Sequence, residues 1–258
     1  MTSKSLIIVL TILLLPLTGF CASRAGQRMK LYFKDAFIPH LWDGTKNTFG
    51  KPENLAYLAA GGALAATAHQ YDWEVDEYWE EHEMDYGLAD VGNGWGDAYL
   101  PIGLSVSMML GGWHYENEKI ANAGEALAEA MIIQGAVINI IKPIANKERP
   151  DQSDNLAFPS GHTGVAFVTA AVLHDRFGWK AGVPAYSLAV ITGLARMDVE
   201  KHWVADVVMG ATIGMVTGYS VSRHHDDYPY EVKRGGPALG LAPMVSPDRY
   251  GVLLVAAW

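Results

Sequence analysis

The sequence predicts an all-α fold, and three observations lead to this prediction. Half of the 258 residues are hydrophobic and only 18% are charged. The apolar residues gather in runs of helical rather than strand length. Glycine and alanine recur within these runs, which lets neighbouring helices approach closely. We expect one helix of a bundle from each of six such runs, at residues 55–68, 98–113, 121–141, 163–173, 181–195 and 203–221.

Residues 1–23 have the order of an export signal. Lys4 precedes an apolar run from Leu6 to Leu17, and small residues follow. We therefore expect a cleaved signal peptide and an exported chain, located in the periplasm or cell envelope. A lipid-modified Cys21 is disfavoured because the bulky Phe20 precedes it. An uncleaved anchor is disfavoured because the run is short for a membrane span.

Residues 24–53 are polar with scattered glycine and proline, and predict a lead-in that packs on the surface through apolar residues such as Phe37 and Trp42. The helical domain is assigned to residues 54–223. Within it, residues 70–97 are acidic and aromatic, which would suit a metal site or a lid. Charge runs are usually solvated faces, so we expect a solvated helix followed by a glycine-rich turn.

The tail, residues 224–258, begins with His-His-Asp-Asp. These four side chains could bind a metal, but we expect them to be the solvated end of the last helix. Two apolar runs then flank a Ser-Pro-Asp turn, at 238–245 and 250–258, and predict a short C-terminal β-hairpin.

Composition limits the partners. The net charge of −9 argues against nucleic acid, whose phosphates favour basic surfaces. A mean hydropathy of +0.08 is modest for a protein with many spans. Two architectures stay open: a periplasmic helical bundle, attached to a membrane or not, and a six-span integral membrane protein with short helices.

Three polar clusters interrupt the apolar runs. In the first, Lys142 and Arg149 bracket a connection in which Pro143 makes continuation of the helix difficult. A lysine and a bidentate arginine suit the oxygens of a phosphate. The alternative is a set of surface cations that complement a helix dipole, and we assign Lys147 and Glu148 to that role.

In the second cluster, Ser160 is a natural N-cap and Gly161 leaves backbone N–H groups open to an anion at a helix start. His162 would lie beside that anion. An ordinary capped helix start is the alternative.

In the third cluster, His202 and Asp206 are four residues apart and face one way on a helix. The carboxylate can hold one imidazole nitrogen and leave the other as a nucleophile or base. A satisfied core histidine is the alternative. Arg196 favours the functional interpretation, because it brings a fixed positive charge to the same end of the bundle.

Taken together, the clusters resemble the three signature motifs of the type 2 phosphatidic acid phosphatase (PAP2) superfamily, which includes class A acid phosphatases and vanadium haloperoxidases. The resemblance extends from about Leu55 to Val221 and implies a PAP2-like six-helix bundle. One position departs from the pattern: Ala195 stands where the family usually has serine before the arginine.

The resemblance also implies roles for the residues. His202 would attack phosphorus and form a phosphohistidine, Asp206 would orient it, and His162 would protonate the leaving oxygen. The remaining motif groups would bind the phosphate: Lys142, Arg149, Ser160, Gly161 and Arg196. No metal and no cofactor are required.

The sequence therefore predicts a metal-independent phosphatase for phosphomonoesters or pyrophosphates of membrane lipids, such as phosphatidic acid, at a membrane surface. A soluble periplasmic acid phosphatase that acts on small phosphomonoesters is the first alternative. A vanadate-dependent haloperoxidase and a non-enzymatic envelope protein are further ones. The presence of every principal motif residue counts against the last, since isolated charges at helix ends are costly without a role.

Overall fold

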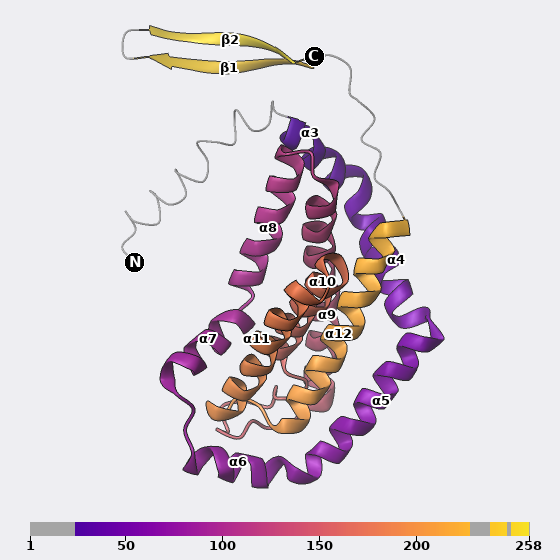
Figure 1. Cartoon of the computed structure of the whole chain (residues 1–258), viewed down its shortest axis with the longest axis vertical. Helices are drawn as coiled ribbons and strands as arrows, with labels where there is room; N and C mark the ends of the chain where they lie inside the picture. Colours follow the sequence, from indigo (N-terminus) through magenta and orange to yellow (C-terminus); the bar gives the residue numbers. More distant parts are fainter. Residues whose placement is uncertain (1–23, 228–237, 247–248, 258) are drawn as a thin grey trace.

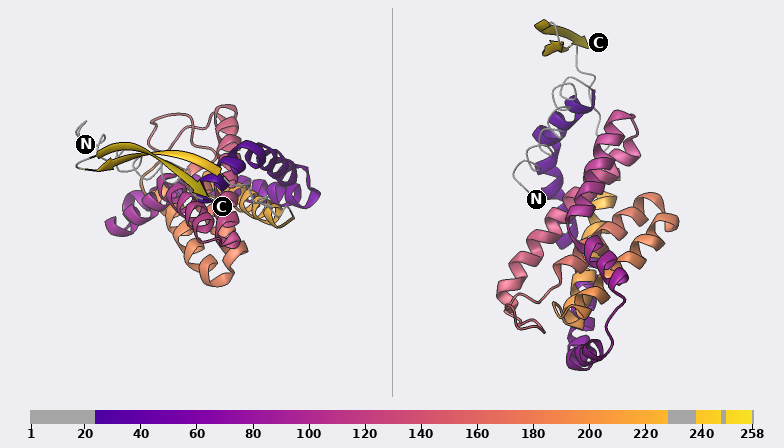
Figure 2. Two further views of the ribbon diagram at one scale, coloured as in Figure 1. Left: turned by 90° about the horizontal axis from the view of Figure 1, so that it is seen from above. Right: turned by 90° about the vertical axis from the view of Figure 1, so that its left-hand side faces the viewer.

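The computed structural model describes residues 24–227, 238–246 and 249–257. Its bundle is all-α (Figure 1) and elongated along one axis (Figure 2). All six predicted helices are present, as α5 (Pro52–Ala68), α8 (Tyr99–His114), α9 (Glu118–Ala145), α10 (Gly161–Phe177), α11 (Trp179–Asp198) and α12 (Val204–Asp227).

The middle of the bundle is the contact between α10 and α12. Helix α10 also packs against α11, and α12 also packs against α5 and α9. Glycines on α12 make the close approach possible. A Cβ atom added at Gly210 would lie 2.4 Å from the Ser160 carbonyl oxygen, and one added at Gly214 would lie 2.4 Å from the Gly164 carbonyl oxygen. The small residues in the apolar runs thus serve helix packing.

Helix α9 continues further than Pro143 led us to expect. It includes Pro143 in its last turn and ends at Ala145. Asn146 then adopts a left-handed conformation with φ of 45°, and its N–H bonds to the Lys142 carbonyl. Pro143 removes one backbone N–H donor from the helix. The helix tolerates this loss because it ends shortly afterwards, at Ala145.

The lead-in is helical and partly buried, which corrects our expectation for residues 24–53. It forms α3 (Arg24–Leu31), a π-helical turn (Tyr32–Ala36) and α4 (Phe37–Gly50). Tyr32 is fully buried, whereas Trp42 is 64% exposed. Helix α4 packs against α9 and α12, so this segment belongs to the bundle.

The acidic stretch forms the expected helix, α6 (Asp72–Glu81), after a short 3₁₀ turn (His69–Tyr71). The predicted glycine-rich turn is wrong, because the chain forms α7 (Tyr86–Gly96) there. A Cβ added at Gly92 would lie 2.8 Å from the Ile191 carbonyl oxygen on α11. The glycines therefore allow α7 to lie directly on α11.

Figure 1 shows how the outer chain encloses the centre. Helices α4 and α5 run beside α12, α6 crosses one end, and α7 and α8 return along the other side. The C-terminal hairpin is confirmed: β1 (Ala238–Ser246) and β2 (Arg249–Ala257) pair antiparallel, with Ser246 opposite Arg249. The predicted signal, residues 1–23, lies outside the described residues.

Candidate active site

The sequence clusters meet at a cavity of about 510 Å³ between the ends of several helices. It is bordered by the junction of α7 and α8, the second half of α9 and the start of α10. Five of the eight predicted site residues line it: Lys142, Arg149, Gly161, His162 and His202. The other three, Ser160, Arg196 and Asp206, do not line the cavity.

His202 is held in one tautomer by a loop carbonyl. Its ring is 2% exposed, and Nδ1 lies 2.7 Å from the Ala157 carbonyl oxygen. A carbonyl only accepts hydrogen bonds, so Nδ1 carries the proton and donates it. The neutral ring then has its lone pair on Nε2. Burial lowers the pKa of His202 to about 4, so the neutral ring predominates above that pH.

Asp206 does not make the predicted hydrogen bond to His202. Its Oδ2 lies 3.7 Å from Nδ1 of the histidine. Oδ2 instead accepts the Trp203 N–H at 2.9 Å. Asp206 is the third residue of α12 and reaches back to the residue before the helix, as the acidic partner of a capping box does. The Asp206 carboxylate therefore caps helix α12. It is still close enough to His202 for a charge interaction.

A partly buried lysine supports Asp206, and the sequence interpretation missed it. Lys147, expected at the surface, has a side chain only 21% exposed. Its Nζ lies 2.9 Å from Asp206 Oδ1 and 2.7 Å from Asp72 Oδ2. Asp72 also accepts the Ala205 N–H at 3.1 Å. Both carboxylates are buried, and a buried charge is costly without a partner. Lys147 therefore holds the start of α12 together.

Ser160 is the predicted N-cap of α10. Its hydroxyl accepts the Thr163 N–H, and its own N–H donates to the Asp206 carbonyl at 3.0 Å. The second of these bonds joins the second and third sequence clusters. An added Cβ at Gly161 would meet only Ile138, at 4.0 Å, so the helix start is open beside the cavity. Such a start favours an anion.

His162 contacts a carboxylate that the sequence interpretation did not single out. Its Nε2 donates to Asp97 Oδ1 at 3.1 Å. Burial and the charge of Arg196 lower the pKa of His162, and Asp97 opposes this shift. Asp97 directly follows the glycine-rich stretch. Because we interpreted that stretch as a solvated turn, we did not expect Asp97 at the site. A carboxylate beside the proposed acid can set both its orientation and its proton affinity.

The cations are fixed by partners on other segments. Arg149 donates from Nε to Asp154 at 2.7 Å and from a terminal nitrogen to the Lys201 carbonyl at 3.1 Å. Arg196 donates to the Asn93 side-chain oxygen at 2.9 Å. Its buried Nε has no hydrogen-bond partner among the described residues. Since buried donors are nearly always paired, this N–H is suited to an anion.

A second, apolar cavity of about 860 Å³ adjoins the first. The two share lining residues, namely Ala98, Gln134, Gly135 and Val165. Aromatic and aliphatic side chains of the lead-in, α8 and α9 form its other walls, among them Phe37, Val106 and Met131. A polar, cationic site thus lies beside an apolar cavity.

Two described helices are long and apolar enough to cross a membrane: α9, and the part of α12 from Val204 to His225. Large apolar side chains on the outside of the bundle add to this. On α9, Ile132, Ile140 and Ile144 are 47%, 62% and 76% exposed. This outer surface suits contact with lipid.

Comparison with known proteins gives a consistent result. Residues 124–228 match the PAP2 superfamily. A lipid A 1-phosphatase of Porphyromonas gingivalis is 30% identical over 122 residues, which cover 46% of this chain and 27% of that protein. A lipid A 4'-phosphatase of Helicobacter pylori is 31% identical over 116 residues, which cover 43% and 54%. The chain thus spans only part of either relative.

The fold also matches a solved structure. The transmembrane PAP2 type phosphatidylglycerolphosphate phosphatase from Bacillus subtilis superposes with a TM-score of 0.57 and 19% identity, over 70% of this chain and 97% of that one. At this identity the match concerns the fold alone. Residues 124–228 of this chain thus match the PAP2 superfamily, and the three sequence clusters and the helical bundle agree with that match.

Proposed function

We propose that this chain is a membrane-associated phosphatase that hydrolyses a phosphate monoester of a lipid, through a phosphohistidine on His202. One observation carries the proposal: a cationic cavity lined by both His202 and His162 shares lining residues with an apolar cavity of about 860 Å³. A lipid phosphate has this division into an anionic head and apolar chains. The two relatives whose names specify lipid A agree with a lipid substrate.

The first step uses the lone pair on His202 Nε2. It attacks phosphorus, so that a P–N bond forms while the P–O bond to the lipid breaks. The leaving oxygen takes a proton from His162, which starts as the imidazolium. Lys142, Arg149 and Arg196 stabilise the charge on the phosphoryl oxygens. The Ala157 carbonyl keeps the proton on Nδ1 and so keeps Nε2 available.

The second step reverses the role of His162. Now neutral, it accepts a proton from a water molecule as that water attacks the phosphohistidine. The P–N bond breaks, inorganic phosphate leaves, and His202 regains its lone pair. Each histidine ends the cycle in its starting state, so no further proton donor is needed.

The test compares substrates and variants in detergent micelles. We expect phosphate release from lipid A or phosphatidic acid with a higher kcat/KM than from p-nitrophenyl phosphate. His202→Gln should lower turnover at least 10³-fold and abolish the phosphoenzyme that an alkaline denaturing quench traps in the wild type, because the nucleophile is gone. His82→Gln, at an exposed histidine directly after α6, is the matched control and should behave like the wild type.

Two outcomes would contradict the proposal. A folded His202→Gln variant that turns over at a wild-type rate would exclude the phosphohistidine. A preference for p-nitrophenyl phosphate, in a protein that stays soluble without detergent, would favour the acid phosphatase alternative.

A further inference from the structure

A second polar cluster lies inside the bundle, away from the candidate active site. His40 of α4, Glu125 of α9 and His225 of α12 each place a ligand atom within 4.8 Å of the other two. Glu125 and His225 are buried, and the His40 side chain is 12% exposed. Our expectation that the His-His-Asp-Asp segment is solvated is wrong for its two histidines, which are 5% and 3% exposed.

Glu129 orients both imidazoles. His225 Nε2 lies 2.8 Å from one carboxylate oxygen, and His40 Nδ1 lies 3.3 Å from the other. Tyr32 donates its hydroxyl proton to the same carboxylate at 2.6 Å. Because a carboxylate accepts these bonds, each neutral ring has its lone pair on the opposite nitrogen, which is Nδ1 of His225 and Nε2 of His40. Histidines that bind metals are commonly held by a carboxylate in this way.

Glu125 supplies an acceptor that lacks a partner. Its Oε1 accepts the Trp113 indole N–H at 2.9 Å. Its Oε2 is buried and has no hydrogen-bond partner among the described residues. An unpaired carboxylate oxygen inside a protein costs free energy of folding. A bound cation or a proton on this oxygen would remove that cost.

We infer that His40, Glu125 and His225 bind a divalent transition-metal ion of the zinc class, with Glu129 as the carboxylate that holds both imidazoles. Zinc takes imidazole and carboxylate ligands at about 2.0–2.2 Å. Ligand atoms around a tetrahedral ion of this size are about 3.4 Å apart. Small side-chain rotations would bring atoms now within 4.8 Å to that spacing.

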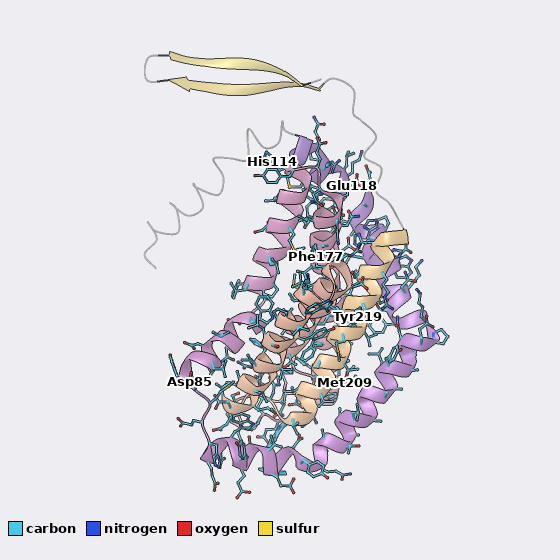
Figure 3. The ribbon with its side chains drawn as sticks, viewed as in Figure 1. Asp85, His114, Glu118, Phe177, Met209 and Tyr219 are labelled. Atoms are coloured by element: carbon cyan, nitrogen blue, oxygen red, sulfur yellow. The ribbon has the colours of Figure 1, made fainter. Side chains whose placement is uncertain are left out.

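This metal site is separate from the candidate active site. His202 lies two residues before α12, whereas His225 lies in its last turn, and this 24-residue helix is about 36 Å long. In Figure 3, α12 rises from Met209 to Tyr219 toward the end of the bundle that carries His114 and Glu118. The metal would therefore join α4, α9 and α12 at the end remote from the phosphate cavity.

The membrane context strengthens the inference. Glu125, Glu129 and His225 lie on the two helices that are apolar and long enough to span a bilayer. Ionisable residues in such helices are rare, face the interior, and have partners there. A bound metal would neutralise these carboxylates and would fix the lead-in helix α4 to the two spans.

The test uses the full chain without an affinity tag, purified in detergent and stripped with a chelator. Zinc chloride is then titrated, and bound metal is measured by mass spectrometry after gel filtration. We expect one zinc ion per chain and a rise in melting temperature. Glu125→Gln keeps the shape of the side chain and should weaken zinc binding at least tenfold. His114→Gln, an exposed histidine on α8, is the control and should bind as the wild type does.

Two results would overturn the inference: a stripped wild-type chain that takes up less than 0.1 equivalent of zinc, or a folded Glu125→Gln variant with unchanged zinc affinity. Low zinc uptake would mean that the buried carboxylates of the cluster are neutralised by protons and not by a metal ion. If Glu125→Gln does not fold, Co²⁺ replaces zinc in the wild type, and a visible spectrum without bands of a nitrogen- and oxygen-ligated ion overturns it. The proposed function is tested separately by phosphate release from the metal-stripped chain below its melting temperature. The proposed function requires this activity, whereas the metal site does not.

Discussion

The tautomer of His202 depends on a backbone carbonyl, and this has consequences for the reaction. The Ala157 carbonyl is 2.7 Å from Nδ1, whereas the nearer oxygen of Asp206 is 3.7 Å away. In the proposed reaction the carbonyl fixes which nitrogen attacks, and it adds no charge to the site. Burial outweighs the charge of Asp206, which raises the pKa of the ring, and the pKa of His202 falls to about 4. A neutral nucleophile is available even in acid.

The pH dependence of the reaction follows from the two histidines. In the free enzyme, kcat/KM should rise as pH increases through about 4, where His202 loses its proton. It should fall at higher pH as His162 deprotonates, because His162 must start as the acid. Burial and Arg196 hold the pKa of His162 below its usual value, so the whole profile should lie on the acid side of neutrality.

Asp97→Asn tests this assignment at a single residue. The Asp97 carboxylate favours the imidazolium of His162, and its removal should lower the pKa of His162 further. The alkaline limb of kcat/KM should then move to lower pH, while the acid limb stays near pH 4. As the reference variant, His162→Gln should lose the alkaline limb and roughly 10²–10⁴-fold in rate. An alkaline limb that Asp97→Asn leaves in place would remove His162 from the role of acid.

The sequence identified the residues at this site better than their contacts. The motif spacing predicted Lys142, Arg149, Gly161, His162 and His202, and the structure brings these five to one cavity. Supporting residues were missed because they come from distant segments. Asp72 and Asp97 lie in an acidic stretch, and a single sequence carries no local sign of which carboxylates in such a stretch turn inward.

At the level of elements, the glycine face of α12 determines how the site is assembled. Gly210 lies against the Ser160 carbonyl, at the N-cap of α10. Asp206, one turn earlier on α12, accepts the Ser160 N–H with its backbone carbonyl. The third cluster is thus attached to the second by direct contact between two backbones, which larger residues would prevent.

Gly210→Ala should disturb this contact. The added Cβ would lie 2.4 Å from the Ser160 carbonyl oxygen, so the two helices must separate. We expect a loss of about 1–3 kcal/mol in stability, seen as a lower melting temperature in detergent, together with a lower kcat. Gly103→Ala is the matched control, because a Cβ there meets nothing within 4 Å. The control should be neutral or slightly stabilising; equal effects of both changes would refute this role of Gly210.

The helices were predictable to different degrees for a physical reason. Long, mainly apolar runs such as that of α9 carry their own signal, because their length favours a helix over a strand. Helix α7 carries little signal, because its glycines have low helix propensity and are present to let it lie on α11. The lead-in was likewise missed, because Tyr32 is buried by contacts that no local pattern specifies.

For the whole molecule, the arrangement of the two cavities favours a lipid. The phosphate cavity and the apolar cavity share Gly135 and Val165, so one molecule can occupy both. Outside the bundle, exposed isoleucines on α9 form an apolar surface. A chain embedded in a bilayer would receive its substrate from the lipid phase.

Val106→Trp tests whether the apolar cavity holds the lipid chains. Val106 lines that cavity but not the phosphate cavity, so an indole there should exclude acyl chains and leave phosphate binding alone. We expect kcat/KM for a long-chain lipid phosphate to fall about tenfold, which corresponds to about 1.4 kcal/mol, with p-nitrophenyl phosphate unaffected. Val190→Trp places the same side chain at a 50% exposed position on α11 and should change neither rate. Equal losses for both substrates in Val106→Trp would mean that the apolar cavity shapes the site but does not hold the chains.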